Sequence, residues 1–202
     1  MKKICILNYG SGNVKSVFNL ANYLGYDTVI SNKKDDITEA THIILPGVGS
    51  FGSAMKKINS LLPIKFLSEE VLIRKKPFLG ICVGMQVLVE KGLEHGEHKG
   101  LGWIKGEVSK LAVNKVPLPH IGWNDIETVN ESPLFYGLGT IKDFYFVHSY
   151  ALTTEQKNVT TETNYEINFC SSIRVENVFG VQFHPEKSQK AGLLVINNFL
   201  DL

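Results

Sequence analysis

Hydrophobic residues in the first half of the chain gather in short runs of two kinds. Lys3–Asn8 and His42–Leu45 are brief, mostly apolar runs typical of buried strands, whereas Val14–Leu24 spaces its apolar residues as an amphipathic helix does. The alternation continues through Asp27–Ser31, Met55–Leu62, Phe66–Arg74, Phe78–Ile81 and Met85–Glu90. Strands that alternate with helices predict an α/β fold with a doubly wound, mixed but mainly parallel sheet and helices on both faces.

The pattern changes after Gly92, where strand-like segments follow one another directly. These segments are Gly102–Leu111, His120–Thr128, Phe144–Leu152, Asn168–Val175 and Val178–Phe183. A final helical pattern, Ala191–Leu200, is expected to pack back on the sheet. No repeat, low-complexity tract or linker divides the sequence, so residues 1–202 are expected to form a single domain.

The composition is that of an ordinary globular protein, with 44% hydrophobic residues, 20% charged residues and a net charge of +1. This near-neutrality favours a small neutral or zwitterionic substrate over nucleic acid or an anionic membrane surface. No apolar run approaches the roughly 18 residues of a membrane span, and the first one ends too soon for a signal peptide. Three cysteines are too few for a disulfide framework, so we expect a cytoplasmic protein.

The segment Gly80-Ile-Cys82-Val-Gly84 lies between an apolar run and a helical pattern that begins at Met85. This order of strand, nucleophile and helix is typical of a nucleophile elbow, here with cysteine in place of serine. The glycines leave room beside the nucleophile and tolerate a strained backbone, and a helix N-terminus favours the reactive thiolate. The structural alternative is a buried cysteine at a strand–helix junction.

Of the six histidines, His184 is the best placed to act as the base of Cys82. It directly follows an apolar strand in the segment Gly180–Glu186, so its side chain is expected at the carboxyl edge of the sheet. Glu186, across Pro185, can hold one ring nitrogen while the other faces the cysteine. In α/β-hydrolases the acid precedes the histidine along the chain, so the order found here disfavours a hydrolase of that fold.

Three other glycine-containing segments carry weaker signals. Pro46-Gly-Val-Gly49 follows a predicted strand and could aim backbone N–H groups at an oxyanion, although ordinary strand ends have similar turns. Gly10-Ser-Gly12 is not a dinucleotide fingerprint, because Lys15 occupies the place of its third glycine. His95-Gly-Glu97-His98 lacks further ligands at metal-binding spacing. We therefore expect no cofactor and no metal.

These motifs together resemble the class I glutamine amidotransferases, the triad glutaminases, which have a flavodoxin-like fold. The resemblance spans most of the chain and rests on Pro46–Gly49, Gly80–Gln86 and Phe183–Ser188. Three further segments resemble, more narrowly, the glutaminase subunits of imidazole glycerol phosphate synthase: Asn8–Asn13, Pro119–Asn124 and Tyr145–Tyr150. Val83 departs from the leucine common after the cysteine of that family, which matters little for a residue that acts through its backbone.

The resemblance implies a role for each of several residues. Cys82 would be the nucleophile, His184 the general acid and base, and Glu186 the carboxylate that orients the imidazole. The oxyanion would be bound at Gly49 and Val83. Glutamine would be held by Gly49, Gln86, His148 and Tyr150. The partner interface and ammonia gate would comprise Asn13, His120, Trp123, Asn124, Tyr145 and Lys187.

The resemblance also implies a reaction and a partner. Glutamine would be hydrolysed to glutamate and ammonia, and the ammonia would pass to a (β/α)₈-barrel cyclase subunit in a heterodimer of histidine biosynthesis. One alternative is a paralogous glutaminase that supplies a sugar-modifying enzyme of surface polysaccharide pathways. Another is a cysteine peptidase or hydrolase on the same scaffold. The intact set of Cys82, His184 and Glu186 disfavours a non-catalytic binding module.

Overall fold

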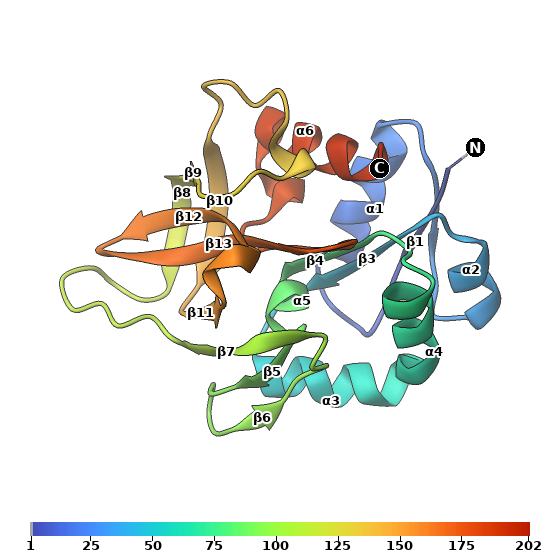
Figure 1. The fold of residues 1–202 in the computed structure, drawn as a ribbon, viewed down its shortest axis with the longest axis horizontal. Coiled ribbons are helices and arrows are strands. Elements are labelled where there is room, and N and C mark those ends of the chain that lie inside the picture. The colour runs from blue at the N-terminus through green and yellow to red at the C-terminus, as the bar shows by residue number, and fades with distance from the viewer. Residues whose placement is uncertain (1) are drawn as a thin grey trace.

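The computed structural model describes residues 2–202, and its centre is a mixed sheet of eight strands (Figure 1). The strands are β1 Lys3–Ile6, β2 Asp27–Ile30, β3 His42–Gly47, β4 Phe78–Cys82, β9 Glu127–Thr128, β12 Val159–Tyr165, β13 Ile167–Val175 and β14 Val178–Val181. Their order is β2-β1-β3-β4-β14-β13-β12-β9, parallel from β2 to β14 and antiparallel from β14 to β9. The carboxyl ends of β3, β4 and β14 therefore meet at one edge.

Helices cover both faces of this sheet. They are α1 Val14–Tyr23, α2 Lys34–Glu39, α3 Phe51–Leu61, α4 Ile64–Ser68, α5 Val83–Gln86 and α6 Gln189–Leu200, with a π-helical turn at Glu69–Ile73 and 3₁₀ turns at Pro133–Phe135, Gln156–Asn158 and Pro185–Lys187. Helices α1 and α6 lie on one face, and α3 and α4 lie on the other (Figure 1). The doubly wound α/β fold predicted from the sequence is confirmed. No helix within residues 2–202 is both long and apolar enough to cross a membrane.

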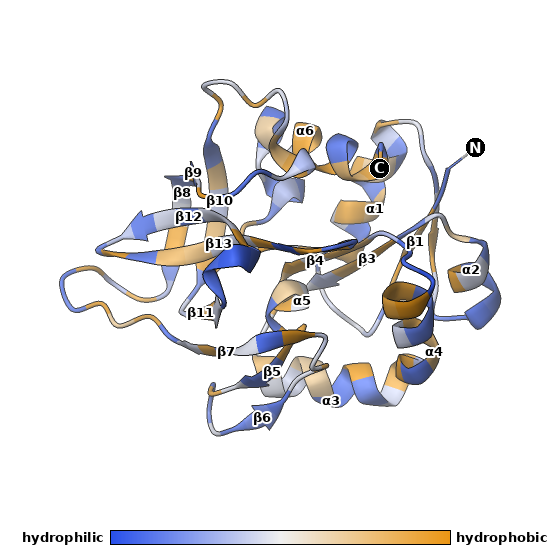
Figure 2. Ribbon diagram, viewed as in Figure 1, coloured by the Kyte–Doolittle hydropathy of each residue, from blue (hydrophilic) through white to orange (hydrophobic). Residues whose placement is uncertain are grey.

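Burial explains why the parallel strands lack an alternating pattern. Every residue of β3 and β4 is buried, and both strands are mostly apolar in Figure 2, as expected for strands covered by helices on both faces. Helix α1 instead buries only one side, through Val14, Val17 and Ala21. The continuous apolar runs of the strands and the helical spacing of apolar residues in α1 thus reflect which surfaces each element buries.

Two smaller sheets flank the central one. Strand β8, His120–Asp125, pairs with β10, Asp143–His148, and a second sheet has the order β11-β7-β5-β6. The members of this second sheet are β5 Val89–Gly92, β6 His98–Lys99, β7 Ile104–Lys110 and β11 Tyr150–Thr154. The prediction of a single strand over Phe144–Leu152 is wrong in extent. The chain changes sheets at Ser149, because β10 pairs with β8 while β11 pairs with β7.

The predicted helix Met85–Glu90 is also wrong in extent, because α5 ends at Gln86 and β5 begins at Val89. Backbone oxygens beyond the first turn accept hydrogen bonds from a distant segment: Leu101 N donates to Val87 O and Gly102 N to Val89 O. Pairing with that segment replaces the continuation of the helix. Tertiary hydrogen bonds thus override the local helical pattern here.

Glycine allows α5 to lie directly on the ends of β3 and β4. A Cβ on Gly84 would lie 1.9 Å from the backbone oxygen of Leu45, and one on Gly80 would lie 2.4 Å from the backbone oxygen of Gly84. At both positions the added Cβ would meet backbone atoms, which cannot move aside as the end of a flexible side chain can. The two glycines that frame Cys82 are therefore required by packing.

We predict that Gly84→Ala lowers the free energy of unfolding by about 2–3 kcal/mol, because the added methyl group overpacks a backbone contact. Chemical denaturation measures this change. Gly12→Ala is the matched control, since its Cβ would meet only a Val48 methyl group at 3.7 Å, an ordinary contact. Equal stability of Gly84→Ala and the wild type would contradict the close packing.

Candidate active site

Cys82 stands at the carboxyl end of β4, where the chain turns sharply into α5. Its backbone has φ 55° and ψ −114°, a conformation that residues with a Cβ rarely adopt. Such a conformation costs about 1–3 kcal/mol and persists only where the surroundings hold it. The glycine contacts below α5 supply this support. The structure therefore has the sharp strand-to-helix turn that a nucleophile elbow requires.

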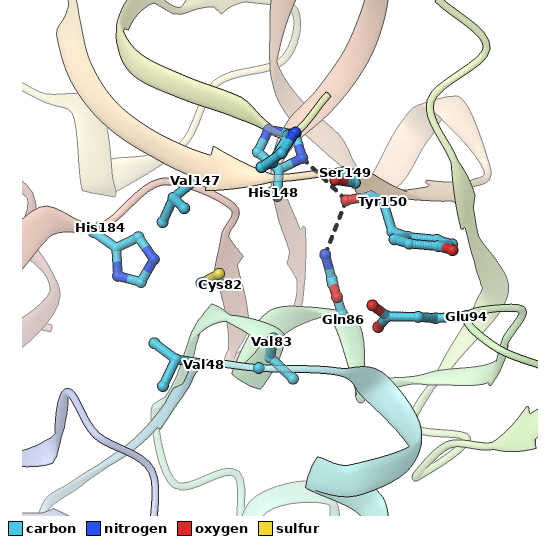
Figure 3. A pocket seen from close by; sticks show the side chains of 12 residues that line it. Val48, Cys82, Val83, Gln86, Glu94, Val147, His148, Ser149, Tyr150 and His184 are labelled. Atoms are coloured by element: carbon cyan, nitrogen blue, oxygen red, sulfur yellow. Dashed lines mark hydrogen bonds between the residues drawn. The ribbon is translucent and has the colours of Figure 1, made fainter. Parts of the chain in front are cut away.

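The thiol of Cys82 opens onto a cavity of about 260 Å³ (Figure 3). This volume lies below the roughly 300–1,000 Å³ typical of sites for drug-sized ligands, so the cavity suits a small metabolite. It brings together His184, the two predicted oxyanion residues Gly49 and Val83, and the predicted glutamine-binding residues Gln86, His148 and Tyr150. Residues predicted from separate motifs thus share one cavity.

His184 and Glu186 form a hydrogen-bonded pair with fully buried side chains. His184 Nδ1 lies 2.8 Å from Glu186 Oε1, and the same oxygen accepts from Asn13 Nδ2 at 2.9 Å. Asn13 is held in turn by Ser11, whose hydroxyl donates to Asn13 Oδ1 at 2.8 Å. The other ring nitrogen of His184, Nε2, is buried without a hydrogen-bond partner on the side of Cys82. This nitrogen is free to exchange a proton with a group on the sulfur.

The charges of this pair are fixed by its neighbours. Burial, the largest influence, lowers the pKa of His184, but the nearby Cys82 sulfur and the hydrogen bond and charge of Glu186 outweigh it and raise the pKa from 6.5 to about 10. Burial likewise opposes ionisation of Glu186, yet the hydrogen bonds from His184 and Asn13 bring its pKa below the usual 4.5. At neutral pH the pair is an imidazolium and a carboxylate.

Polar groups at the far end of the cavity provide acceptors for a cation. Gln86 Nε2 donates to the backbone oxygen of Tyr150 at 3.0 Å and to Gln182 Oε1 at 2.9 Å. Its own Oε1 therefore remains for the cavity, where it points toward the Glu94 carboxylate (Figure 3). Glu94 is held in place by accepting a hydrogen bond from Phe51 N at 2.8 Å. An ammonium group fits this end of the cavity.

His148, which lines the cavity, forms a hydrogen-bonded pair with a second buried histidine, His120. His148 Nδ1 lies 3.0 Å from the backbone oxygen of Tyr150, which only accepts, so this nitrogen carries a proton. Burial lowers the pKa of His148 to about 3 and that of His120 to about 4, so both rings are neutral at pH 7. His148 Nε2 then accepts from His120 Nδ1 at 3.2 Å, and His120 Nε2 accepts from Asn124 Nδ2 at 3.2 Å.

The turn between β3 and α3 packs directly against the start of α5. A Cβ on Gly47 would lie 2.4 Å from the backbone nitrogen of Gly84, so no side chain separates the two segments. Gly49 has φ +95°, a left-handed conformation that favours glycine. Val83, the first residue of α5, has an N–H without a partner inside the helix. Backbone groups of the turn and of Val83 therefore border the same cavity.

The residues expected at a partner interface occupy two environments. Trp123 is 43% exposed and its ring stacks edge-on with that of Tyr145, while Lys187 Nζ lies 5.3 Å from the centre of the Tyr145 ring. Asn13 and His120 are buried instead, with 6% and 3% exposure. Asn13 contacts Glu186 rather than solvent, so it can hold that carboxylate beside His184.

Two residues at the site, Glu94 and Gln182, are not predicted from the sequence. Glu94 belongs to no motif, and its place depends on how β5 and α3 pack. Gln182 directly follows β14 and precedes His184 by two positions, where the chain bends at Gln182 and Phe183. Its Nε2 lies 3.6 Å from Cys82 Sγ, a contact that depends on this bend and on the packing of β14 beside β4.

We predict distinct protonation states for the histidines of the site at pH 7. Long-range ¹H–¹⁵N NMR should find His120 and His148 neutral with the proton on Nδ1, and His184 with both nitrogens protonated. Since the folded pKa of His184 exceeds 6.5, its contribution to stability is full below pH 6.5 and is lost as the pH rises through about 10. Cys82→Ala should lower the pKa of His184; a neutral His184 at pH 7 in the wild type contradicts the assignment.

Comparison with known proteins identifies the family. The model of the class-I glutamine amidotransferases matches residues 5–202. The imidazole glycerol phosphate synthase subunit HisH 2 of Vibrio vulnificus strain YJ016 is 46% identical over 201 residues, which cover 98% of this chain and 94% of that protein. The subunit HisH of the same synthase from Aquifex aeolicus strain VF5 is 45% identical over 196 residues, or 96% of this chain and 94% of that protein.

A solved structure supports the fold alone. PurLQS from Thermotoga maritima has a TM-score of 0.77 and 20% identity, with 99% of this chain and 98% of that chain covered. The match of the family model and the relatives extend over almost the whole sequence. The chain therefore belongs to the class-I glutamine amidotransferase family and, within it, to the relatives of the HisH subunits of imidazole glycerol phosphate synthase.

Proposed function

We propose that this chain is the glutaminase subunit of an imidazole glycerol phosphate synthase and supplies ammonia to a cyclase partner. The proposal rests on similarity to HisH subunits over almost the entire chain. It is supported by the buried pair of His184 and Glu186 beside Cys82 at one small cavity. We treat residues 1–202 as a single glutaminase domain, because elements from both halves of the chain line this cavity. A thiol nucleophile suits a reducing compartment, so the proposal includes a cytoplasmic location.

The first half of the proposed reaction forms a thioester. The Cys82 thiolate attacks the carboxamide carbon of glutamine, and the resulting oxyanion accepts hydrogen bonds from Val83 N–H and from the turn at Gly49. Each such donor is typically worth about 3 kcal/mol in the transition state. His184 transfers the proton on Nε2 to the departing nitrogen, the C–N bond breaks, and ammonia leaves.

The second half hydrolyses the thioester. The neutral His184 takes a proton from water, the hydroxyl group attacks the thioester carbon, and the C–S bond breaks to release glutamate and the thiolate. Glu186 holds the imidazole in one orientation throughout, and Asn13 holds Glu186. The imidazolium returns at the end of the cycle, ready to protonate the next leaving group.

The cavity suits glutamine better than a peptide. Glu94 and Gln86 Oε1 provide acceptors for the α-ammonium group at one end, while Cys82 meets the carboxamide at the other. His148 and Tyr150 border the space between them. A volume of about 260 Å³ leaves no room for a chain that continues on both sides of the scissile bond. These features disfavour the cysteine peptidase alternative.

The proposed docking face for a (β/α)₈-barrel cyclase is the exposed side of β8 and β10. Ile121 is 60% exposed and Trp123 is 43% exposed, an unusual pair of large apolar residues on one strand. Ile121 pairs with Val147, which lines the cavity, so this face extends to the site where ammonia forms. A partner docked there would shield ammonia from water, which would protonate it to the non-nucleophilic ammonium ion.

Cys82→Ala should abolish glutamate release, because no other side chain replaces the nucleophile. The assay compares the chain alone with the chain plus the barrel subunit and its ribotide substrate, which should accelerate wild-type hydrolysis. Cys170→Ala, at a buried cysteine outside the cavity, is the control and should retain activity. The proposal would be contradicted if Cys82→Ala still released glutamate, or if the barrel subunit did not accelerate glutamine hydrolysis by the wild type.

A reagent separates glutaminase from peptidase chemistry. A diazo-ketone analogue of glutamine should label Cys82 and block hydrolysis, whereas a peptidase would react with peptide-based electrophiles instead. Mass spectrometry of the modified peptide identifies the labelled residue.

Glu94→Gln should raise KM for glutamine at least tenfold with a smaller change in kcat, because the carboxylate binds the α-ammonium group, far from the reacting carbon. Steady-state kinetics of the complex measures both constants. Glu97→Gln is the matched control in the neighbouring loop, since Glu97 does not line the cavity. An unchanged KM in Glu94→Gln would remove Glu94 from the substrate site.

A further inference from the structure

We propose that Gln182 acts on the nucleophile itself, by donating a hydrogen bond from its side-chain amide to the sulfur of Cys82 and so favouring the thiolate. The inference rests on the proposed function, because it takes Cys82 as the nucleophile. Gln182 Nε2 lies 3.6 Å from Cys82 Sγ, within hydrogen-bonding distance for sulfur. The side chain is fully buried and lies behind the cysteine, since it does not line the cavity.

The orientation of the Gln182 amide follows from a backbone carbonyl. Tyr150 O can only accept, so the group of Gln86 that faces it at 3.0 Å is the NH₂ group. The same NH₂ group lies 2.9 Å from the Gln182 amide, which must present its oxygen there. The nitrogen of Gln182 is therefore the end that faces Cys82. Reversing either amide would set two donors or two acceptors against each other.

The Tyr150 carbonyl is itself fixed from a second side. His148 Nδ1 donates to it at 3.0 Å, and the chain of donors continues through His120 to Asn124. On the other side, the backbone N–H of Gln182 donates to Ser171 O at 2.9 Å. Both ends of the Gln86–Gln182 contact are therefore held by the scaffold. The side-chain N–H group of Gln182 is therefore already oriented to donate a hydrogen bond to the sulfur.

The charge of the sulfur decides whether this donor is satisfied. A neutral thiol is a weak hydrogen-bond acceptor. A buried amide N–H that faces a thiol has therefore lost its hydrogen bonds to water and gained only a weak one in their place. A thiolate is an anionic acceptor, and hydrogen bonds to charged groups are the stronger kind. The arrangement thus stabilises Cys82 as an anion, both before attack and when it leaves the thioester. The proton of the amide stays on its nitrogen throughout.

Gln182→Met tests this role, because methionine has a similar shape and no N–H group. In the chain alone, the alkylation rate of Cys82 by iodoacetamide at pH 7, followed by mass spectrometry of its peptide, should fall by about tenfold. In the complex with the barrel subunit, kcat for glutamine should fall by a similar factor, with KM changed less than threefold. Thr163→Val, a buried polar-to-apolar change away from the sulfur, is the control and should leave both rates unchanged.

A wild-type alkylation rate in folded Gln182→Met overturns the inference, as does a loss of activity confined to KM. If the variant does not fold, NMR of the wild type replaces it. Cys82→Ala should shift the side-chain amide signal of Gln182 far more than that of exposed Gln156, and equal shifts overturn the inference. Alkylation needs no glutamine, so a slower rate in a chain that never hydrolyses glutamine would refute the proposed function alone.

Discussion

The direct backbone contact between α5 and the ends of β3 and β4 is the constraint on which the site depends. Gly84 rests on the Leu45 carbonyl and Gly47 rests on the Gly84 nitrogen, with no side chain between them. This contact holds Cys82 at φ 55° and brings the turn at Gly49 beside Val83. A strained residue is stable only when its surroundings determine it more strongly than the strain opposes it. The parallel strands, covered on both faces, provide that rigidity.

Three histidines near the cavity illustrate how surroundings set the charge of one side chain. His184 faces a carboxylate and the Cys82 sulfur and remains protonated, whereas His148 and His120 face a carbonyl, an amide and each other, and remain neutral. All three are buried. Burial alone would lower the pKa of all three rings, so the groups that each ring contacts determine which one is charged. The positive charge is therefore confined to His184, the ring that gives up a proton in the proposed reaction.

Much of the fold and the core of the candidate site could be predicted from the sequence, because the signals are local. Glycines at fixed spacing around Cys82 and a glutamate two residues after His184 define short-range geometry. The polar strand β12 and the helix α2, which buries only Ile37, lack a hydrophobic pattern and were missed. Glu94 could not be found because its position depends on the packing of α3, and β5 replaced a predicted helix because a distant segment pairs with it.

The fixed position of the Glu94 carboxylate also bears on which amino-acid amides can react. Its hydrogen bond to Phe51 N ties it to the start of α3, and Cys82 is tied to the start of α5, so neither end of the cavity adjusts freely. Glutamine and asparagine differ by one methylene, a difference worth about 1–3 kcal/mol in an ordinary apolar pocket. In the proposed binding mode, the shorter molecule cannot keep its ammonium at Glu94 and also bring its carboxamide to the sulfur. The proposed glutaminase would therefore select its substrate by length, and asparagine would be excluded by geometry rather than by repulsion.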